Sequence, residues 1–379
     1  MKNPKIFLSP PDVGEAEKIH VAEALESGWV APVGSKLDEF ENLVSRNAGR
    51  SFGVGLSSGT SALHLGLIAL GVCRGDYVIC STLTFVASAN VILYLGAIPI
   101  FVDSDGETGN MSPDLLKIAI EESRARGQKI AAVIVVDFLG SVARYEELEP
   151  LLKQHGIPLL ADAAEALGAS RGNRPAGNFG DAAVFSFNGN KIATTSAGGV
   201  FVTDDSKIAE RVRFLSSQAR EPALHYEHSE LGYNYRLSNL LAAVGVAQMM
   251  RLEEFVARRR QNRANYRALF GDLPGARVLG VADSEDNCWL TAVVVDPAVV
   301  GFEPEEMSRS LAENGIESRP LWKPMHLQPL YQAAEAYVDG TAEQLFLQGV
   351  ALPSGSNLSR SQWDRIEGTI RSFFDAHQR

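Results

Sequence analysis

The chain has 379 residues, of which 45% are hydrophobic and 21% are charged, and its formal net charge is -11. This composition excludes extended disorder, and the length favours a large domain with a smaller companion domain. The acidic net charge argues against a nucleic-acid backbone as the main partner. The N-terminal sequence lacks the apolar segment of a secretory signal, and apolar runs such as residues 130–136 fall short of the roughly 18 residues that span a bilayer, so we expect a cytoplasmic protein with no membrane partner.

Short apolar runs with strand character alternate with segments of helical period between about residues 50 and 205. The expected strands are residues 52–57, 77–80, 98–103, 129–137, 157–162, 182–187 and 199–203. The expected helices between them are residues 58–70, 85–95, 113–123 and 145–155. This alternation predicts an α/β fold with a mostly parallel seven-stranded sheet, in which ligands bind beyond the carboxyl ends of the strands.

The pattern changes at residues 236–270, a long charge-studded stretch of helical character that is a plausible connector between two lobes. The elements expected beyond it are a strand at residues 288–296, a helix near 304–315 and a strand near 316–320. We therefore expect a large α/β domain at residues 13–248. Residues 249–379, together with residues 1–12, should form a small α+β domain.

The three cysteines, Cys73, Cys80 and Cys288, are widely spaced and have apolar neighbours in the sequence. An odd number at such spacing indicates buried thiols rather than a disulfide framework or a metal site. We expect no bound metal.

The segment Ser58-Gly59-Thr60 joins an expected strand to an expected helix. Unpaired backbone amides and the helix dipole favour a phosphate group at such a terminus. Taken alone, the segment is better explained as an ordinary helix cap with glycine in a tight turn.

Asp162 ends an apolar strand, and Glu165 follows three residues later. A carboxylate at the edge of a sheet suits a cationic ring nitrogen, as a pyridine cofactor requires, and Glu165 would lie on the same side of a helical turn. Taken alone, these residues are better explained as a helix cap and a solvated acid.

Lys191 follows Asn-Gly-Asn and precedes a Thr-Thr-Ser-Ala-Gly-Gly segment, in a turn between two expected strands. Its neighbours are small, apolar or hydroxylic, and no second charge shares the loop. This setting suits an amine that forms an imine and moves protons. Most lysines are solvated surface charges, but the small neighbours weaken that alternative.

Five motifs occur in the order SSGTSALHL, TLTFVASA, ADAAEALG, SFNGNK followed by TTSAGG, and GYNYRLSN. Together they resemble the DegT/DnrJ/EryC1/StrS family of nucleotide-sugar aminotransferases, and the resemblance spans almost the whole chain. It implies the aspartate-aminotransferase fold, also called fold type I of enzymes that use pyridoxal 5'-phosphate. It also implies a transaminase with that cofactor.

The resemblance assigns roles to individual positions. Lys191 matches the lysine that forms the internal aldimine, Asp162 matches the carboxylate that pairs with the pyridinium nitrogen, and Phe85 matches the aromatic that stacks on the cofactor ring. The implied cofactor-binding set is Ser58, Gly59, Thr60, Phe85, Asp162, Glu165, Ser186, Lys191 and Asn234. Asn234 matches a residue supplied by the neighbouring subunit, which implies a homodimer with shared active sites. Glu165 stands where many relatives have glutamine or histidine, and it faces either the substrate or the phenolic oxygen of the cofactor.

The implied reaction takes the amino group from L-glutamate, leaves the cofactor in its pyridoxamine form, and passes the group to a nucleotide-linked keto-sugar. Residues 186–196, 218–239 and 317–326 look like the subgroup that aminates C4 of UDP-4-keto-6-deoxy-N-acetylglucosamine in bacillosamine biosynthesis. The candidate substrate residues are His225, Tyr226, His228, Arg236, Arg319, Trp322 and His326, each of which also has a structural interpretation. The alternatives are a GDP- or dTDP-linked sugar, aminated at C3 or C4, and a non-catalytic protein that binds nucleotide sugars on the same fold.

Overall fold

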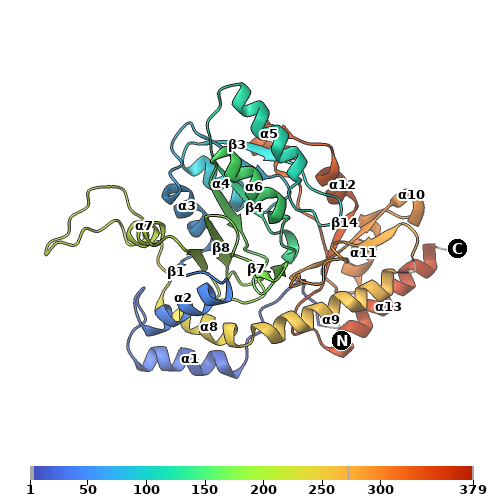
Figure 1. Cartoon of the computed structure of the whole chain (residues 1–379). Helices are drawn as coiled ribbons and strands as arrows, with labels where there is room; N and C mark the ends of the chain where they lie inside the picture. Colours follow the sequence, from blue (N-terminus) through green and yellow to red (C-terminus); the bar gives the residue numbers. More distant parts are fainter. Residues whose placement is uncertain (1–3, 272, 378–379) are drawn as a thin grey trace.

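The computed structural model describes residues 4–271 and 273–377, and its centre is an eight-stranded sheet (Figure 1). In spatial order the strands are β1 (Phe52–Leu56), β9 (Gly199–Thr203), β8 (Ala182–Ser186), β5 (Leu159–Asp162), β4 (Ile130–Val136), β2 (Tyr77–Ser81), β3 (Ile98–Val102) and β13 (Glu335–Tyr337). Strand β9 runs antiparallel to β1 and β8, and all pairs from β8 to β13 are parallel. The predicted α/β class is confirmed.

All seven predicted strands are present, and the eighth strand, β13, comes from the C-terminal part of the chain. It pairs with β3 at the edge of the sheet, with Glu335 opposite Ile100. Three residues are too few to show an alternating pattern, so the sequence analysis missed this strand.

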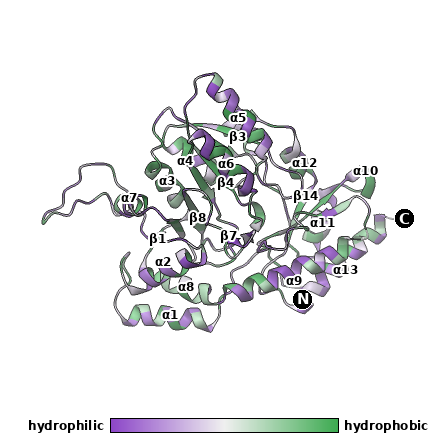
Figure 2. Cartoon of the chain, in the orientation of Figure 1, coloured by the Kyte–Doolittle hydropathy of each residue, from purple (hydrophilic) through white to green (hydrophobic). Residues whose placement is uncertain are grey.

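Helices cover both faces of the sheet because its strands bury side chains on both sides. In β4, Val133 and Val135 pack in one core, whereas Ala132 and Ile134 pack in the other. The crossover helices are α3 (Gly59–Ala69), α4 (Val86–Tyr94), α5 (Pro113–Ala125) and α6 (Tyr145–His155), followed by α7 (Ser206–Ser216). Figure 2 shows strongly hydrophobic strands at the centre and hydrophilic faces on the outer helices.

The predicted helical stretch at residues 236–270 is two helices, α8 (Asn239–Met250) and α9 (Leu252–Phe270). The break lies at Arg251, whose backbone leaves the helical region and whose guanidinium pairs with Asp12. Two further helices, α1 (Glu15–Glu26) and α2 (Ser35–Asn47), pack against α8.

A second, four-stranded sheet lies beside the large one and is antiparallel. Its strands, in order, are β10 (Ala276–Val278), β11 (Thr291–Val295), β14 (Gly349–Leu352) and β12 (Arg319–Pro320). The accompanying helices are α10 (Pro297–Val300), α11 (Pro304–Glu313), α12 (Thr341–Gln348) and α13 (Arg360–His377). Residue Ile6 pairs with Ile316, so the N-terminal segment contacts this part of the chain. The predicted domain boundaries stay a prediction.

The remaining short elements connect these layers. They are the two-stranded sheet of β6 (Ser170–Arg171) and β7 (Arg174–Pro175) and the 3-10 turns η1 (Phe138–Gly140), η2 (Met325–Leu327) and η3 (Pro329–Tyr331). Within the described residues, no helix has the length and apolar character needed to cross a bilayer. The cytoplasmic location stays a prediction.

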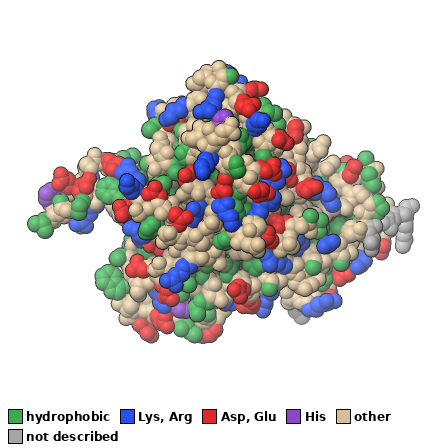
Figure 3. All heavy atoms as spheres, viewed as in Figure 1, with side chains coloured by type: hydrophobic (Ala, Val, Ile, Leu, Met, Phe, Trp, Pro, Cys, Tyr) green, Lys and Arg blue, Asp and Glu red, His purple; other side chains and the backbone are tan. Residues whose placement is uncertain are grey.

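Residues 217–236, which we call the arm, extend away from the body of the protein after α7 (Figure 1). The arm exposes the large apolar residues Leu224, Tyr226 and Leu231. Figure 3 shows both apolar and charged side chains along it. Because this arrangement leaves apolar area in water, the arm has the character of a contact surface.

Candidate active site

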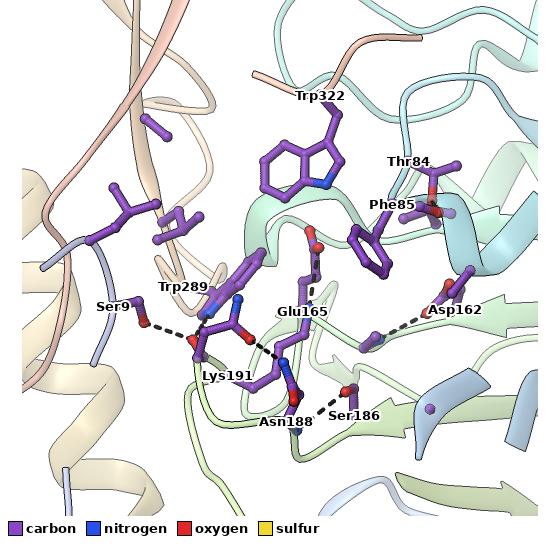
Figure 4. A pocket seen from close by; sticks show the side chains of 18 of the residues that line it. Ser9, Thr84, Phe85, Asp162, Glu165, Ser186, Asn188, Lys191, Trp289 and Trp322 are labelled. Atoms are coloured by element: carbon purple, nitrogen blue, oxygen red, sulfur yellow. Dashed lines mark hydrogen bonds and ion pairs between the residues drawn. The ribbon is translucent and has the colours of Figure 1, made fainter. Parts of the chain in front are cut away.

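A pocket of about 920 Å³ opens at the carboxyl ends of the central strands, where sequence reasoning placed the ligand site. Its walls come from three parts of the chain: the edge of the large sheet, the second sheet with Trp289 and Trp322, and the N-terminal residues 7–11. Figure 4 shows 18 of its residues and labels ten, among them Lys191, Glu165 and Asp162. Such a concave site with few convergent polar groups is typical of a small-molecule site.

Lys191 lies in the turn between β8 and β9, and its amine points into the pocket. The backbone N–H of Lys191 donates to the carbonyl of Asn188 at 3.0 Å, which closes the turn. The Nζ atom lies 3.3 Å from Oε1 of Glu165 and 4.0 Å from the ring centroid of Trp289. The amine is therefore held by a carboxylate on one side and by an aromatic face on another.

Asp162 ends β5 and is almost fully buried. The Ser88 hydroxyl donates to its Oδ2 at 2.6 Å, and the Ala164 N–H donates to its Oδ1 at 3.2 Å. Burial raises the pKa of this carboxyl above its ordinary value, since both of these donors are neutral. A cation placed beside Asp162 would favour its ionised form.

Glu165 is also buried, and burial raises the pKa of its carboxyl. Its Oε2 accepts the Leu139 N–H at 2.8 Å, while Oε1 faces Lys191. Asn287 donates from Nδ2 to the backbone carbonyl of Glu165 at 2.8 Å. The sequence left the direction of Glu165 open between substrate and cofactor, and in the structure its carboxylate meets the lysine amine.

The opposite end of the pocket has the features of a phosphate cradle. Ser58 caps α3, with its hydroxyl accepting the Ser61 N–H at 3.0 Å, so the first amides of the helix are open to a ligand. A Cβ on Gly59 would lie 3.1 Å from the Cβ of Ser186. A Cβ on Gly199 would overlap the Ser58 carbonyl and approach the Gly59 nitrogen to 2.6 Å. Gly59 and Gly199 therefore allow the backbone segments around Ser58 and Ser186 to approach closely without a side chain between them.

An aromatic wall completes the pocket. Phe85 precedes α4 and is 58% exposed, although it lies at the centre of the pocket lining. Trp322 stands near it in Figure 4, with Trp289 on the side of the lysine. Arg319 lies among the lining residues and pairs with Glu317 at 2.9 Å.

The pocket contains most of the predicted cofactor residues and two of the predicted substrate residues. The predicted residues that line it are Ser58, Gly59, Thr60, Phe85, Asp162, Glu165, Ser186, Lys191, Arg319 and Trp322. His326 lies outside the lining and its Nδ1 is 2.7 Å from the Thr82 hydroxyl. Arg236 is turned to Glu41 at 2.8 Å, with both side chains nearly buried, so its position in this chain is that of a structural ion pair.

The other predicted residues lie on the arm, outside the pocket of the same chain. Asn234 is exposed at the base of the arm, where it bridges to Ser217. His225, Tyr226 and His228 are exposed further along it. The predicted roles of these residues in binding cofactor or substrate stay predictions, because the arm lies outside the pocket of its own chain and would have to reach that of a second chain.

Sequence reasoning missed three contributors to the pocket. Ser88 had a signal, since it follows the predicted cofactor-stacking Phe85 by three residues on one helix. Trp289 had only the signal of a tryptophan next to an apolar run. The N-terminal residues 7–11 had none beyond the proline pair, because their place over the pocket depends on distant contacts such as the Ser9 hydroxyl bonded to the Asn190 carbonyl.

These residues fit pyridoxal phosphate by their chemistry. The exposed face of Phe85 can stack on a planar ring, and the buried Asp162 suits the protonated nitrogen of a pyridine. The α3 terminus with Ser186 suits a phosphate, and Lys191 supplies the amine. Each feature is separate from the others, and the pocket brings all of them together.

Comparison with known proteins agrees with this chemistry. Residues 11–371 match the DegT/DnrJ/EryC1/StrS aminotransferase family. EpsN of Bacillus subtilis (strain 168), provisionally named a pyridoxal phosphate-dependent aminotransferase, is 44% identical, and the match covers 98% of this chain and 96% of EpsN. The GDP-perosamine synthase of Escherichia coli O157:H7 is 35% identical, with 96% of this chain and 97% of the relative covered.

Among solved structures, the PLP-form of Spr1654 from Streptococcus pneumoniae, provisionally named a sugar aminotransferase, superposes with a TM-score of 0.89. It is 28% identical and covers 98% of this chain and 99% of its own. The PMP-form of the same protein has a TM-score of 0.88. The chain therefore belongs to the DegT/DnrJ/EryC1/StrS family and is a sugar aminotransferase that depends on pyridoxal phosphate.

Proposed function

We propose that this enzyme transfers the amino group of L-glutamate to C4 of a UDP-linked 4-keto-6-deoxy-N-acetylhexosamine. The observation that carries the choice of sugar is the apolar wall of Trp289 and Trp322 beside Lys191. A 6-deoxy sugar with an acetamido group presents two methyl groups, which such a wall would contact favourably. At the pocket lining, Arg319 offers a planar guanidinium for a diphosphate.

The proposed roles of the protein groups follow from their positions. When bound, pyridoxal phosphate supplies an aldehyde that takes up an amino group and a ring that withdraws electrons from the reacting carbon. Asp162, fixed by Ser88, would keep the ring nitrogen protonated. Lys191 would take the α-proton of glutamate and return it to the neighbouring carbon, and the same steps in reverse would aminate the keto-sugar.

A GDP-linked keto-sugar is the second candidate, because a relative 35% identical over nearly the whole chain is named GDP-perosamine synthase. A dTDP-linked sugar and amination at C3 are further alternatives within the same reaction class. A sugar with a C2 hydroxyl in place of the acetamido group would leave part of the apolar wall without contact.

The test is a direct comparison of keto-sugars. Enzyme loaded with pyridoxal phosphate and glutamate is incubated with the UDP-, GDP- and dTDP-linked 4-keto-6-deoxy sugars, and the amino-sugar is measured by mass spectrometry. We expect the highest kcat/KM with the UDP-linked N-acetylated sugar. Product from the GDP- or dTDP-linked sugar alone would overturn the proposed substrate and leave the transaminase activity intact.

We also propose a homodimer in which the arm of one protomer reaches the pocket of its partner. The arm exposes Leu224, Tyr226 and Leu231 with relative accessibilities of 107%, 78% and 75%, respectively. The nearby segment between α1 and α2 exposes Trp29 and Val33 as well. Apolar area of this extent is what a subunit interface covers.

Mixing two inactive variants tests the shared site. Lys191→Ala removes the proposed base, and Asn234→Ala removes the proposed contribution of the partner. If the site is shared, the mixed dimer has one complete site, and random mixing should restore about one quarter of the wild-type activity. Mixtures that stay inactive although mass measurements show mixed dimers would contradict the shared site.

A further inference from the structure

The carboxylate of Glu165 holds the amine of Lys191 inside the pocket. Oε1 lies 3.3 Å from Nζ, and the ring centroid of Trp289 lies 4.0 Å from the same atom. The side chain of Glu165 is 5% exposed and that of Lys191 is 11% exposed, so water screens their attraction much less than that of a surface pair. This contact is stronger than an exposed lysine–carboxylate pair would be.

The surrounding chain fixes the position of this carboxylate. Leu139 donates its N–H to Oε2 at 2.8 Å and has a φ of +55°, a left-handed conformation that leucine adopts at a cost. Asn287, which is fully buried, donates to the backbone carbonyls of Glu165 and Leu167. Support of this kind keeps a functional side chain in one orientation before a ligand arrives.

We propose that Glu165 is a positioning residue that aims the free Lys191 amine into the pocket. Lys191 would carry the transferred proton on Nζ, and Glu165 would keep that amine aimed at the reacting atoms. The proposal rests on the proposed role of Lys191 as the base. A glutamine at position 165 would keep the acceptor for the Leu139 N–H and lose the charge.

Other ionisable groups also face this pair. Asp162 and Asp137 are buried acids that interact with Glu165 through their charges, and Asp162 raises the pKa of Glu165 by repulsion, after the larger effect of burial. Glu317 and Arg319 line the same pocket and pair with each other. Asp137 is the better control, since its carboxyl accepts the Ala143 N–H, whereas the ion pair of Lys191 is with Glu165.

The first test uses protein without cofactor and needs no sugar. Reductive methylation by formaldehyde and cyanoborohydride consumes the unprotonated amine, and mass spectrometry of the Lys191 peptide gives its rate. At pH 7.5 we expect roughly tenfold faster labelling of Lys191 in Glu165→Gln than in wild type, because the variant lacks the carboxylate that holds the amine at 3.3 Å. Exposed Lys18 is the internal standard and should not change.

Two variants control for structure. Asp137→Asn removes a neighbouring acid without touching Lys191, and its Lys191 labelling should stay within about twofold of wild type. Glu165→Asp keeps the negative charge but places it farther from Lys191, because the side chain is one methylene shorter. The rate of Lys191 labelling in this variant should fall between those of wild type and Glu165→Gln. This variant also serves if Glu165→Gln does not fold. An unchanged rate in Glu165→Gln, or an equal rise in Asp137→Asn, would overturn the proposal.

The second readout is the visible absorption of the cofactor-loaded protein. The Glu165 charge should hold the lysine-linked cofactor in its protonated, yellow form to higher pH. In Glu165→Gln we expect the midpoint of the colour change about one pH unit lower. A wrong choice of nucleotide sugar would leave both readouts unaffected, and an identical midpoint in the two proteins would count against the role of Glu165.

Discussion

Asp137 is a buried carboxyl that follows β4 and gives a stability prediction with a defined pH window. Its Oδ1 accepts the Ala143 N–H at 2.9 Å, whereas no partner within normal hydrogen-bond distance is found for Oδ2 among the described residues. The Tyr145 hydroxyl is close enough to lower the pKa of this acid slightly, although it too lacks a partner at normal distance. Burial dominates and raises the pKa of Asp137 from 3.8 to about 7.

The sign follows from the direction of this change. An acid whose pKa is higher in the folded state binds protons more tightly there, so the free energy of unfolding falls as the pH rises from about 4 to about 7 and is constant above that. The difference, 7 minus 3.8, multiplied by 1.36 kcal/mol per pH unit gives a cost of about 4 kcal/mol at pH 8. This is an upper limit, since water penetration reduces the cost of burying a charge.

Asp137→Asn should therefore stabilise the protein by about 1 to 4 kcal/mol at pH 8 and by less than half as much at pH 5, where only the interval from 3.8 to 5 contributes. Asparagine keeps an oxygen that accepts the Ala143 N–H, and its amide N–H can donate to the Tyr145 hydroxyl oxygen. The assay is urea unfolding of both proteins at pH 5 and pH 8. Tyr145→Phe, which removes the hydroxyl and keeps the carboxyl, is the control and should retain the pH dependence. Equal effects of Asp137→Asn at the two pH values would refute the reasoning.

Four further substitutions, one of them a control, test the site and its supports. Ser88→Ala removes the 2.6 Å hydrogen bond to Asp162 and should weaken cofactor affinity about tenfold, as measured by absorbance titration. Gly199→Ala should displace the Ser58 carbonyl and cost about 2 kcal/mol or more in thermal unfolding, whereas Gly368→Ala, in open space on α13, should stabilise by about 0.5 to 1 kcal/mol. Arg236→Ala should cost about 3 kcal/mol and leave the KM for the sugar unchanged, and a raised KM with unchanged stability would restore Arg236 as a substrate residue.

The centre of the site could be predicted from the sequence because five motifs in order resemble the family, although Asp162 taken alone was better explained as a helix cap. Asp162 ends a strand and Lys191 follows one, and the carboxyl ends of neighbouring parallel strands meet at one edge of a sheet. Strand β8, which precedes Lys191, pairs with β5, which ends at Asp162. The two residues therefore reach one pocket as a consequence of topology. The alternation of strands and helices predicted a mostly parallel sheet, and the structure gives the order of its strands.

Other parts of the site depend on contacts that no local pattern contains. Trp289 reaches Lys191 because its indole N–H donates to the Asn190 carbonyl at 2.8 Å, a contact across 99 positions. The N-terminal segment lies over the pocket because the Leu8 N–H donates to Glu317 at 3.1 Å, a contact across 309 positions. The orientation of Glu165 required knowledge of Leu139, whose left-handed backbone breaks the usual preference of leucine.

The charge balance of the pocket connects its structure to its cofactor. Burial raises the pKa of Asp137, Asp162 and Glu165, so each ionised carboxyl would gain from a nearby positive charge. Lys191 contacts Glu165, whereas Asp162 receives only neutral donors from Ser88 and the backbone. A protonated ring nitrogen beside Asp162 would satisfy that carboxylate, and the carboxylate would in turn keep the ring cationic and electron-withdrawing. Burial away from water destabilises the ionised Asp162. The same burial strengthens the attraction of Asp162 for the protonated ring nitrogen, which the reaction needs to be charged.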